Sequence, residues 1–194
     1  MALSWPYDHD KFTAYPGDTL STNLTLAVWV VDDFTLCGPL GPIRVVIKEG
    51  DIKAFRNLGG YYLFTDMAAG NYTVAIESDL YYSREKIVDT SLLDPKNPVL
   101  PVVIKPKTAY PFPAYATLVR GIVMNADPVA GAEVKVSGKP NETVTDDRGE
   151  FVLYFKGIRK EDITIEIKKD GNTKNVNITV EEGKAVSTGI IVFP

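Results

Sequence analysis

The chain repeats one short pattern, as Gly60-Tyr61-Tyr62-Leu63-Phe64 and again as Gly149-Glu150-Phe151-Val152-Leu153. Each copy follows a segment that opens with a proline, and the segments Pro39–Gly60 and Pro128–Gly149 have the same length. Within each segment, an alternating apolar stretch leads to a polar turn that ends at the glycine. The sequence therefore predicts two related β modules in tandem.

The alternating stretches indicate strands with one buried face, and their apolar positions are Ile43, Val45 and Ile47 in the first copy and Val134 and Val136 in the second. The two copies also close alike, with Val102–Pro106 matching Ile190–Pro194. We expect an N-terminal arm over 1–19, a first module over 20–106, a linker over 107–116 and a second module over 117–194. Modules of roughly 85 residues lie within the usual size range of domains.

The arm is rich in aromatic residues, Asp, Pro and Gly without regular spacing, so we expect it to be irregular and packed on the first module. The linker places prolines among aromatic residues, which favours an extended, semi-rigid spacer. We expect Tyr110, Phe112 and Tyr115 to dock onto a module and to fix the orientation of the two modules.

Short strands separated by turns follow one another along the chain, and helix signals are nearly absent. The expected strands include 24–31, 43–48, 71–77, 86–90, 118–123, 133–136, 142–145, 151–155, 163–168, 175–180 and 186–193. In the first strand we expect Leu24, Leu26, Val28 and Val30 to face the core and Trp29 to face the other way. This spacing is typical of an all-β sandwich.

The two glycine corners have matching turn chemistry. Asn57 and Asp146 are short polar residues that can accept hydrogen bonds from their own turn backbone. Gly60 and Gly149 allow a positive φ where the chain reverses. We expect Tyr62 and Phe151, two residues after each glycine, to enter the cores.

The second module resembles the carboxypeptidase regulatory-like domain, a transthyretin-like (prealbumin-like) β-sandwich. The resemblance rests on Gly121-Ile122-Val123, on Pro128–Val134 and on Thr145-Asp146-Asp147-Arg148-Gly149-Glu150-Phe151. The first module is a more divergent copy, in which Gly38–Gly41 corresponds to the proline turn and Ala69–Val74 to the Gly-x-Tyr strand. The resemblance implies two tandem Greek-key, Ig-like sandwiches that act as accessory, non-catalytic domains.

The resemblance also favours use outside the cytoplasm or at a cell surface. Met1–Phe12 contains no secretory signal, so a cytoplasmic location stays open. No apolar run reaches the roughly 18 residues needed to span a bilayer, so we expect no membrane insertion. Lys plus Arg number 21 and Asp plus Glu 25, so no basic field favours nucleic acid as a partner.

The residues offer little catalytic chemistry. His9 is the only histidine and Cys37 the only cysteine, which argues against a catalytic triad and a zinc site. We interpret Cys37 as a small, semi-buried residue, with an intermolecular disulfide as the alternative. The candidate calcium ligands lack the spacing of a dedicated loop and are interpreted as turn formers: Asp32, Asp33, Asp127, Asp146 and Asp147. We therefore expect no enzyme activity, no cofactor and no metal.

Four aromatic residues are candidate contacts for a partner or a glycan: Trp29, Tyr61, Tyr81 and Tyr82. Outward rings can stack on sugars or anchor a protein partner. They can equally cover the seam between the modules or lie under the arm. The leading hypothesis is a non-catalytic structural or protein-binding protein. The alternatives are carbohydrate binding and a role in a phage-tail-like or cell-surface assembly.

Overall fold

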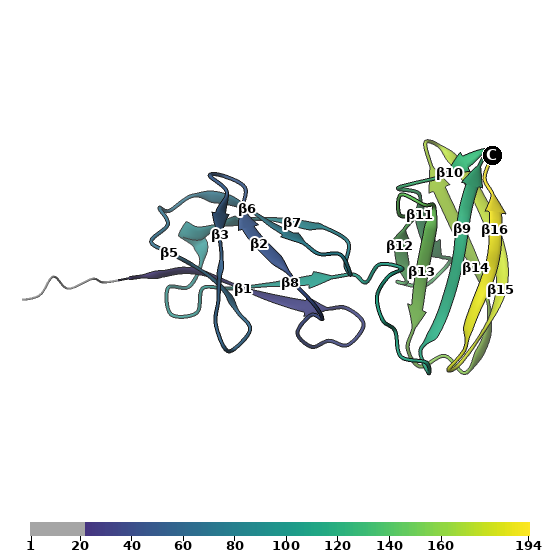
Figure 1. The fold of residues 1–194 in the computed structure, drawn as a ribbon, viewed down its shortest axis with the longest axis horizontal. Helices are drawn as coiled ribbons and strands as arrows, with labels where there is room; N and C mark the ends of the chain where they lie inside the picture. Colours follow the sequence, from purple (N-terminus) through teal and green to yellow (C-terminus); the bar gives the residue numbers. More distant parts are fainter. Residues whose placement is uncertain (1–21) are drawn as a thin grey trace, which may run out of the picture.

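The computed structural model describes residues 22–194, and within them the chain consists of strands, turns and one short 3-10 turn at Thr90–Leu92 (Figure 1). The predicted all-β architecture of two tandem sandwiches is confirmed. The arm assigned to 1–19 lies outside the described residues.

The first module packs two four-stranded sheets against each other. One has the order β4 (Phe55–Arg56), β5 (Tyr62–Thr65), β1 (Leu24–Asp32), β8 (Val99–Ile104). The other has the order β3 (Ile52–Lys53), β2 (Arg44–Ile47), β6 (Asn71–Glu77), β7 (Arg84–Asp89).

The second module repeats this arrangement. Its first sheet centres on β9 (Thr117–Asn125), which pairs with β10 (Asp127–Pro128), β13 (Glu150–Phe155) and β16 (Ala185–Val192). Its second sheet has the order β12 (Glu142–Val144), β11 (Glu133–Val136), β14 (Lys160–Lys169), β15 (Asn172–Glu181).

Strand pairing supports the duplication seen in the sequence. In each module the opening strand pairs antiparallel with the strand that follows the glycine corner, β5 or β13, and parallel with the closing strand, β8 or β16. Tyr62 lies opposite Val28 in the first module, and Phe151 lies opposite Gly121 in the second. The matched stretches of sequence therefore occupy matched positions in the two sheets.

Each module has its own hydrophobic core. Tyr62 and Phe64 lie in the first and Phe151 and Leu153 in the second, all nearly inaccessible to solvent. The predicted placement of Tyr62 and Phe151 is confirmed. A smaller cluster around Ala116, between the two cores, includes side chains of both modules and of the linker.

The glycine corners also match their prediction. Asn57 accepts the backbone N–H of Tyr61 at 2.9 Å, and Asp146 accepts that of Glu150 at 2.9 Å. Gly60 has a φ of 84° and Gly149 a φ of 71°. The polar side chain and the glycine together reverse the chain before each aromatic strand.

Three sequence expectations are wrong in detail. Leu24 is 44% exposed because the pairing of β1 with β5 shifts register between Leu24 and Leu26. Strand β2 begins at Arg44, so Ile43 precedes it. Cys37 is exposed because the loop after β1 carries it away from the core.

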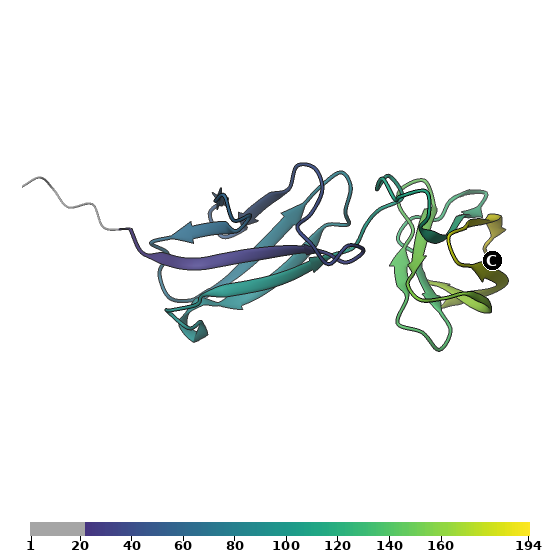
Figure 2. The same ribbon diagram turned by 90° about the horizontal axis from the view of Figure 1, so that it is seen from below.

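The two sandwiches follow one another along the longest axis of the molecule (Figures 1 and 2). Strands β1 and β8 of the first module run along this axis, and the long strands of the second module run across it. One end of the first module thus meets the side of the second where β12 and β13 lie.

Candidate functional site

The linker inserts a tyrosine into the first module. Tyr110 is 3% exposed and belongs to the first core. Its hydroxyl donates a hydrogen bond of 2.6 Å to Oδ2 of Asp32, the last residue of β1. Phe112 is half-buried, whereas Tyr115 is exposed, so the expectation that Tyr115 docks onto a module is wrong.

Asp32 is a buried carboxylate with several donors. Besides Tyr110, its Oδ2 accepts the hydroxyl of Tyr81 at 3.1 Å. Its Oδ1 accepts the backbone N–H groups of Phe34 at 2.8 Å and Thr35 at 3.4 Å. A buried charge is costly unless such donors surround it. The carboxylate therefore joins the linker, the loop after β1 and the loop that carries Tyr81.

The two tyrosines remain protonated donors in neutral solution. Burial raises the pKa of Tyr81 to about 12. Burial also raises the pKa of Tyr110, and the hydrogen bond to Asp32 and the charge of that carboxylate add to the effect. Both hydroxyls therefore keep the proton that they donate.

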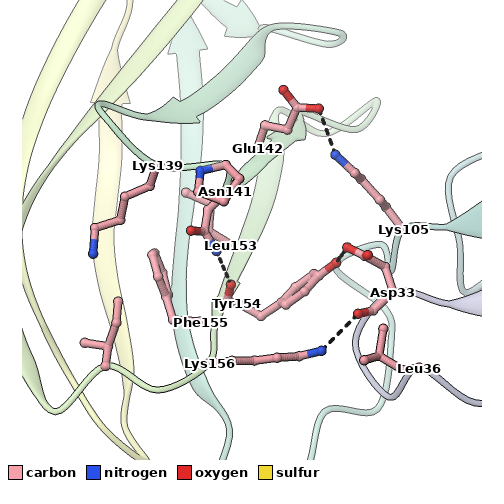
Figure 3. Close-up of a pocket in the computed structure, with 12 residues that line it drawn as sticks. Asp33, Leu36, Lys105, Lys139, Asn141, Glu142, Leu153, Tyr154, Phe155 and Lys156 are labelled. Atoms are coloured by element: carbon pink, nitrogen blue, oxygen red, sulfur yellow. Dashed lines mark hydrogen bonds and ion pairs between the residues drawn. The ribbon is translucent and has the colours of Figure 1, made fainter.

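The neighbouring carboxylate, Asp33, bonds to the second module (Figure 3). Its side chain accepts the hydroxyl of Tyr154 on β13, and its backbone carbonyl accepts Nζ of Lys156 at 3.2 Å. Burial, with the hydrogen bond to Asp33, raises the pKa of Tyr154. Asp32 and Asp33 thus bind one tyrosine from the linker and one from the second module.

Aromatic rings fill the space beside these carboxylates. Phe34 of the first module lies edge-on to Phe112 of the linker, at 5.1 Å between ring centroids, and to Tyr154 of the second, at 5.5 Å. Such edge-to-face pairs contribute about 0.5–1.5 kcal/mol each beyond the burial of their area. Aromatic residues therefore cover the seam between the modules, which was one of the alternatives left open by the sequence. Most of them are not the four aromatic residues that the sequence singled out.

Two polar contacts extend the junction toward strand β12. The hydroxyl of Tyr82 donates to the carbonyl of Val144 at 2.6 Å, and Lys105 pairs with Glu142 at 2.9 Å. Both acceptors lie at a sheet edge, where unpaired backbone groups can otherwise bind another chain. The first module thus caps part of this edge.

Thr108 ties the linker to the second module. Its hydroxyl donates to Asp146 at 2.8 Å, and its carbonyl accepts Nη1 of Arg120 at 3.1 Å. Arg120 also lies over the ring of Phe112, at 5.8 Å from the centroid. The linker is therefore bonded to both modules.

A groove of about 670 Å³ lies at the junction (Figure 3). Lys105, Lys139 and Lys156 contribute positive charges to its walls, and Asp33 and Glu142 contribute carboxylates. Within residues 22–194, no three His, Cys, Asp or Glu side chains are grouped to hold a metal ion. The groove can accept a polar chain or loop, and its lining contains no histidine or cysteine.

The four predicted contact residues separate into different environments. Trp29 and Tyr61 are half-buried and lie together, with ring centroids 4.8 Å apart. Tyr81 is 1% exposed, so of the two alternatives left open it is a packed ring and not an outward contact: its hydroxyl binds Asp32, and its ring fills the first core. Tyr82 is half-buried at the junction.

Sequence reasoning missed two exposed apolar residues near the aromatic pair. Phe55 on β4 is 71% exposed, and Leu58 in the following turn is fully exposed. Phe55 lies opposite Leu63, which lies opposite Ala27 on β1. The signal available in the sequence was a phenylalanine, Phe55, close to the charged residues Lys53 and Arg56. We call Trp29, Phe55, Leu58, Tyr61 and Leu63 the apolar face.

Four of the five aspartates considered as calcium ligands lie in turns or at the junction, and the fifth, Asp127, begins strand β10. Asp32 and Asp146 each accept backbone N–H groups of their own turn, as expected of turn formers. His9 lies outside the described residues. Within residues 22–194, no helix has the length and apolar character needed to cross a membrane.

No family model matches the chain, and no curated protein matches its sequence. Similar solved structures include a type II cohesin–X-dockerin complex from Acetivibrio cellulolyticus, with 22% identity over 40% of this chain and 56% of that chain at a TM-score of 0.34. The Bacillus anthracis TIE protein has 13% identity over 88% of this chain and 34% of that chain, at a TM-score of 0.34. The shaft pilin spaA from Lactobacillus rhamnosus GG has 11% identity over 89% of this chain and 97% of that chain, at a TM-score of 0.30.

The chain thus spans 56% of the first of these solved chains and 34% of the second. TM-scores of this size support no inference about function. The resemblance to the carboxypeptidase regulatory-like domain stays a prediction.

Proposed function

We propose that the chain is a non-catalytic structural protein that holds two β-sandwiches in one relative orientation and presents their loops and sheet edges to a protein partner. One observation carries the proposal. The adjacent carboxylates of Asp32 and Asp33 bind a linker tyrosine, Tyr110, and a second-module tyrosine, Tyr154.

This arrangement suits a rigid spacer better than two freely moving domains. Tyr110 contributes its side chain to the first core, and Thr108 bonds to the second module only two residues earlier. The linker has little room to flex without breaking one of these contacts. Interfaces between domains are otherwise modest and allow relative motion by default.

A protein partner agrees with the surface of the chain. The junction groove carries both lysines and carboxylates, which suits a polar loop of another protein. The net charge of −4 gives no broad positive field for nucleic acid.

The test captures partners from native extract with the full chain and with Tyr110→Phe/Tyr154→Phe, followed by cross-linking. We expect partners cross-linked at residues near the junction, and weaker capture by the double variant while both cores stay folded. Equal capture by both proteins, with cross-links remote from the junction, would contradict the proposed role of a fixed orientation.

Carbohydrate binding is the second candidate, favoured by the stacked Trp29 and Tyr61. Sugar rings stack on half-exposed aromatic rings of this kind. Binding to a glycan array that disappears in both Trp29→Ala and Tyr61→Ala would support it, and an array without any signal would remove it.

A place in a phage-tail-like or cell-surface assembly stays a prediction, as does use outside the cytoplasm. Both agree with two small sandwiches that follow one another along one axis (Figure 2). Fractionation of source cells, with detection of the chain by antibody, tests the location directly.

A further inference from the structure

The segment that precedes the second module covers part of its first sheet. Leu118 on β9 and Val152 on β13 alternate with the core residues Val119 and Phe151, so they face away from that core. Both are nevertheless buried, at 4% and 1% exposed, because Phe112 of the linker and Phe34 pack against them.

The first module has an equivalent face. Tyr62 lies opposite Val28 in the first module, as Phe151 lies opposite Gly121 in the second. Leu63, the residue after Tyr62, therefore occupies the position of Val152. Phe55 lies directly beside Leu63 and is 71% exposed. Within residues 22–194, the apolar face therefore lacks the cover that its counterpart has.

The chain before the first module repeats a string of the linker. Thr13-Ala14-Tyr15-Pro16 is identical to Thr108-Ala109-Tyr110-Pro111. The first string begins 11 residues before Leu24, where β1 starts, and the second begins 9 residues before Thr117, where β9 starts. The linker string is the part that bonds to the second module through Thr108.

We propose that residues 11–21 bind the apolar face of their own first module, as the linker binds the second. The string lies outside the described residues. Its length decides whether it can reach the apolar face. Eleven residues span up to about 36 Å when extended, against about 30 Å for a nine-residue strand such as β1. Asn23 still pairs with Asp66, so the segment would turn back before Thr22, and its length then suffices to reach the apolar face.

Phe12 and Tyr15 are the rings available to this segment. Gly17 stands where the linker has Phe112, so Phe12, three residues before Tyr15, must supply the second ring. An aromatic ring of this segment on Phe55 and Trp29 removes apolar area from water, as Phe112 does on the second module.

The consequence concerns the aromatic pair. Trp29 and Tyr61 would be an intramolecular contact, and a glycan or a protein would have to displace residues 11–21 to reach them. This inference does not rest on the proposed function, because a covered face is compatible with any partner at the junction.

Quenching of tryptophan fluorescence by iodide tests the proposal. Trp5→Phe leaves Trp29 as the only tryptophan of the chain, which has two. We compare this variant with Trp5→Phe/Phe12→Ala/Tyr15→Ala, and expect a larger quenching constant and a red-shifted emission in the triple variant. Trp5→Phe/Tyr7→Ala is the matched control and should behave like Trp5→Phe.

Equal quenching of Trp29 in all three variants would overturn the proposal. Quenching of the Trp5→Phe protein that rises on dilution would also overturn it, because the covering segment would then belong to a second copy. The substitutions lie outside residues 22–194, and circular dichroism melts of all three variants check that the two modules stay folded. If the partner-capture experiment contradicted the proposed role of the junction, the result expected from this quenching experiment would not change.

Discussion

Tyr110 and Asp32 are 78 residues apart in the chain, yet the tyrosine hydroxyl donates to the buried carboxylate at 2.6 Å. One residue comes from the linker and the other from the opening strand of the first module. This contact makes the linker part of the first core, and Asp33 extends the same corner to Tyr154 of the second module.

Tyr110→Phe should lower the free energy of unfolding by about 1.5–3 kcal/mol, because a hydrogen bond to a charged group is lost while the carboxylate stays buried. Guanidinium unfolding followed by circular dichroism measures the change. Tyr115→Phe is the matched control, since Tyr115 is 79% exposed, and it should have almost no effect. Equal effects of the two substitutions would contradict the role given to Tyr110.

Gly121→Ala should destabilise the second module strongly. A methyl group at this position would lie 2.7 Å from the ring of Phe151 and 2.1 Å from Oγ1 of Thr188. Overpacking in a filled core typically costs about 1–3 kcal/mol. Thermal melts of Gly121→Ala, Phe151→Leu and the double variant measure the coupling. The double variant should lose less than the sum of the single losses, and strict additivity would refute the ring contact.

The two glycine corners should respond unequally to alanine. Both have a positive φ, but a Cβ at Gly149 would lie 2.4 Å from the carbonyl oxygen of Val123, whereas one at Gly60 meets only the ring of Trp29, at 3.4 Å. Gly60→Ala should cost about 1–2 kcal/mol, the left-handed penalty for an L-residue. Gly149→Ala should cost more, because backbone must move. Urea midpoints of both variants settle the order, and a larger loss at Gly60 would be the contrary result.

Stability should fall as the solution becomes alkaline. Burial raises the pKa of Tyr81 to about 12, and it also raises the pKa values of Tyr110 and Tyr154. In the unfolded chain these hydroxyls ionise near pH 10, so between about pH 10 and 12 the unfolded state binds fewer protons than the folded state. The stability contribution is complete below pH 10 and is lost above it.

Melting temperatures between pH 8 and pH 12 test this dependence. Tyr81→Phe/Tyr110→Phe removes two of the buried hydroxyls, so its stability should decline less steeply with pH than that of the parent chain. Parallel curves for the two proteins would show that these tyrosines do not cause the decline.

The internal repeat was enough to predict most of the fold from the sequence. Alternating residues such as Val134 and Val136 identify strands because a strand with one buried face has a period of two. Asn57 and Asp146 identify the corners because their side chains bond to nearby backbone, a local interaction. Features of this kind depend on a few neighbouring residues, so they can be recognised in a single sequence.

At the junction, the sequence predicted that Tyr110 and Phe112 dock onto a module, but it did not predict which residues they contact. Tyr81 and Tyr110 lie in loops, where no period separates inward from outward residues, and their burial depends on a carboxylate far away in the chain. Asp32 looked like a turn former, which it is, but its second oxygen serves the two tyrosines. Contacts between distant loops require the packed structure.

The fixed orientation of the two modules is tested most directly by the distance between a spin label on each. In a Cys37→Ser chain, Lys96→Cys and Lys174→Cys place labels on exposed residues of the first and second modules. Pulsed electron paramagnetic resonance should give one narrow distance distribution, which broadens in Tyr110→Phe/Tyr154→Phe. A broad distribution in the chain with its junction intact would contradict the account.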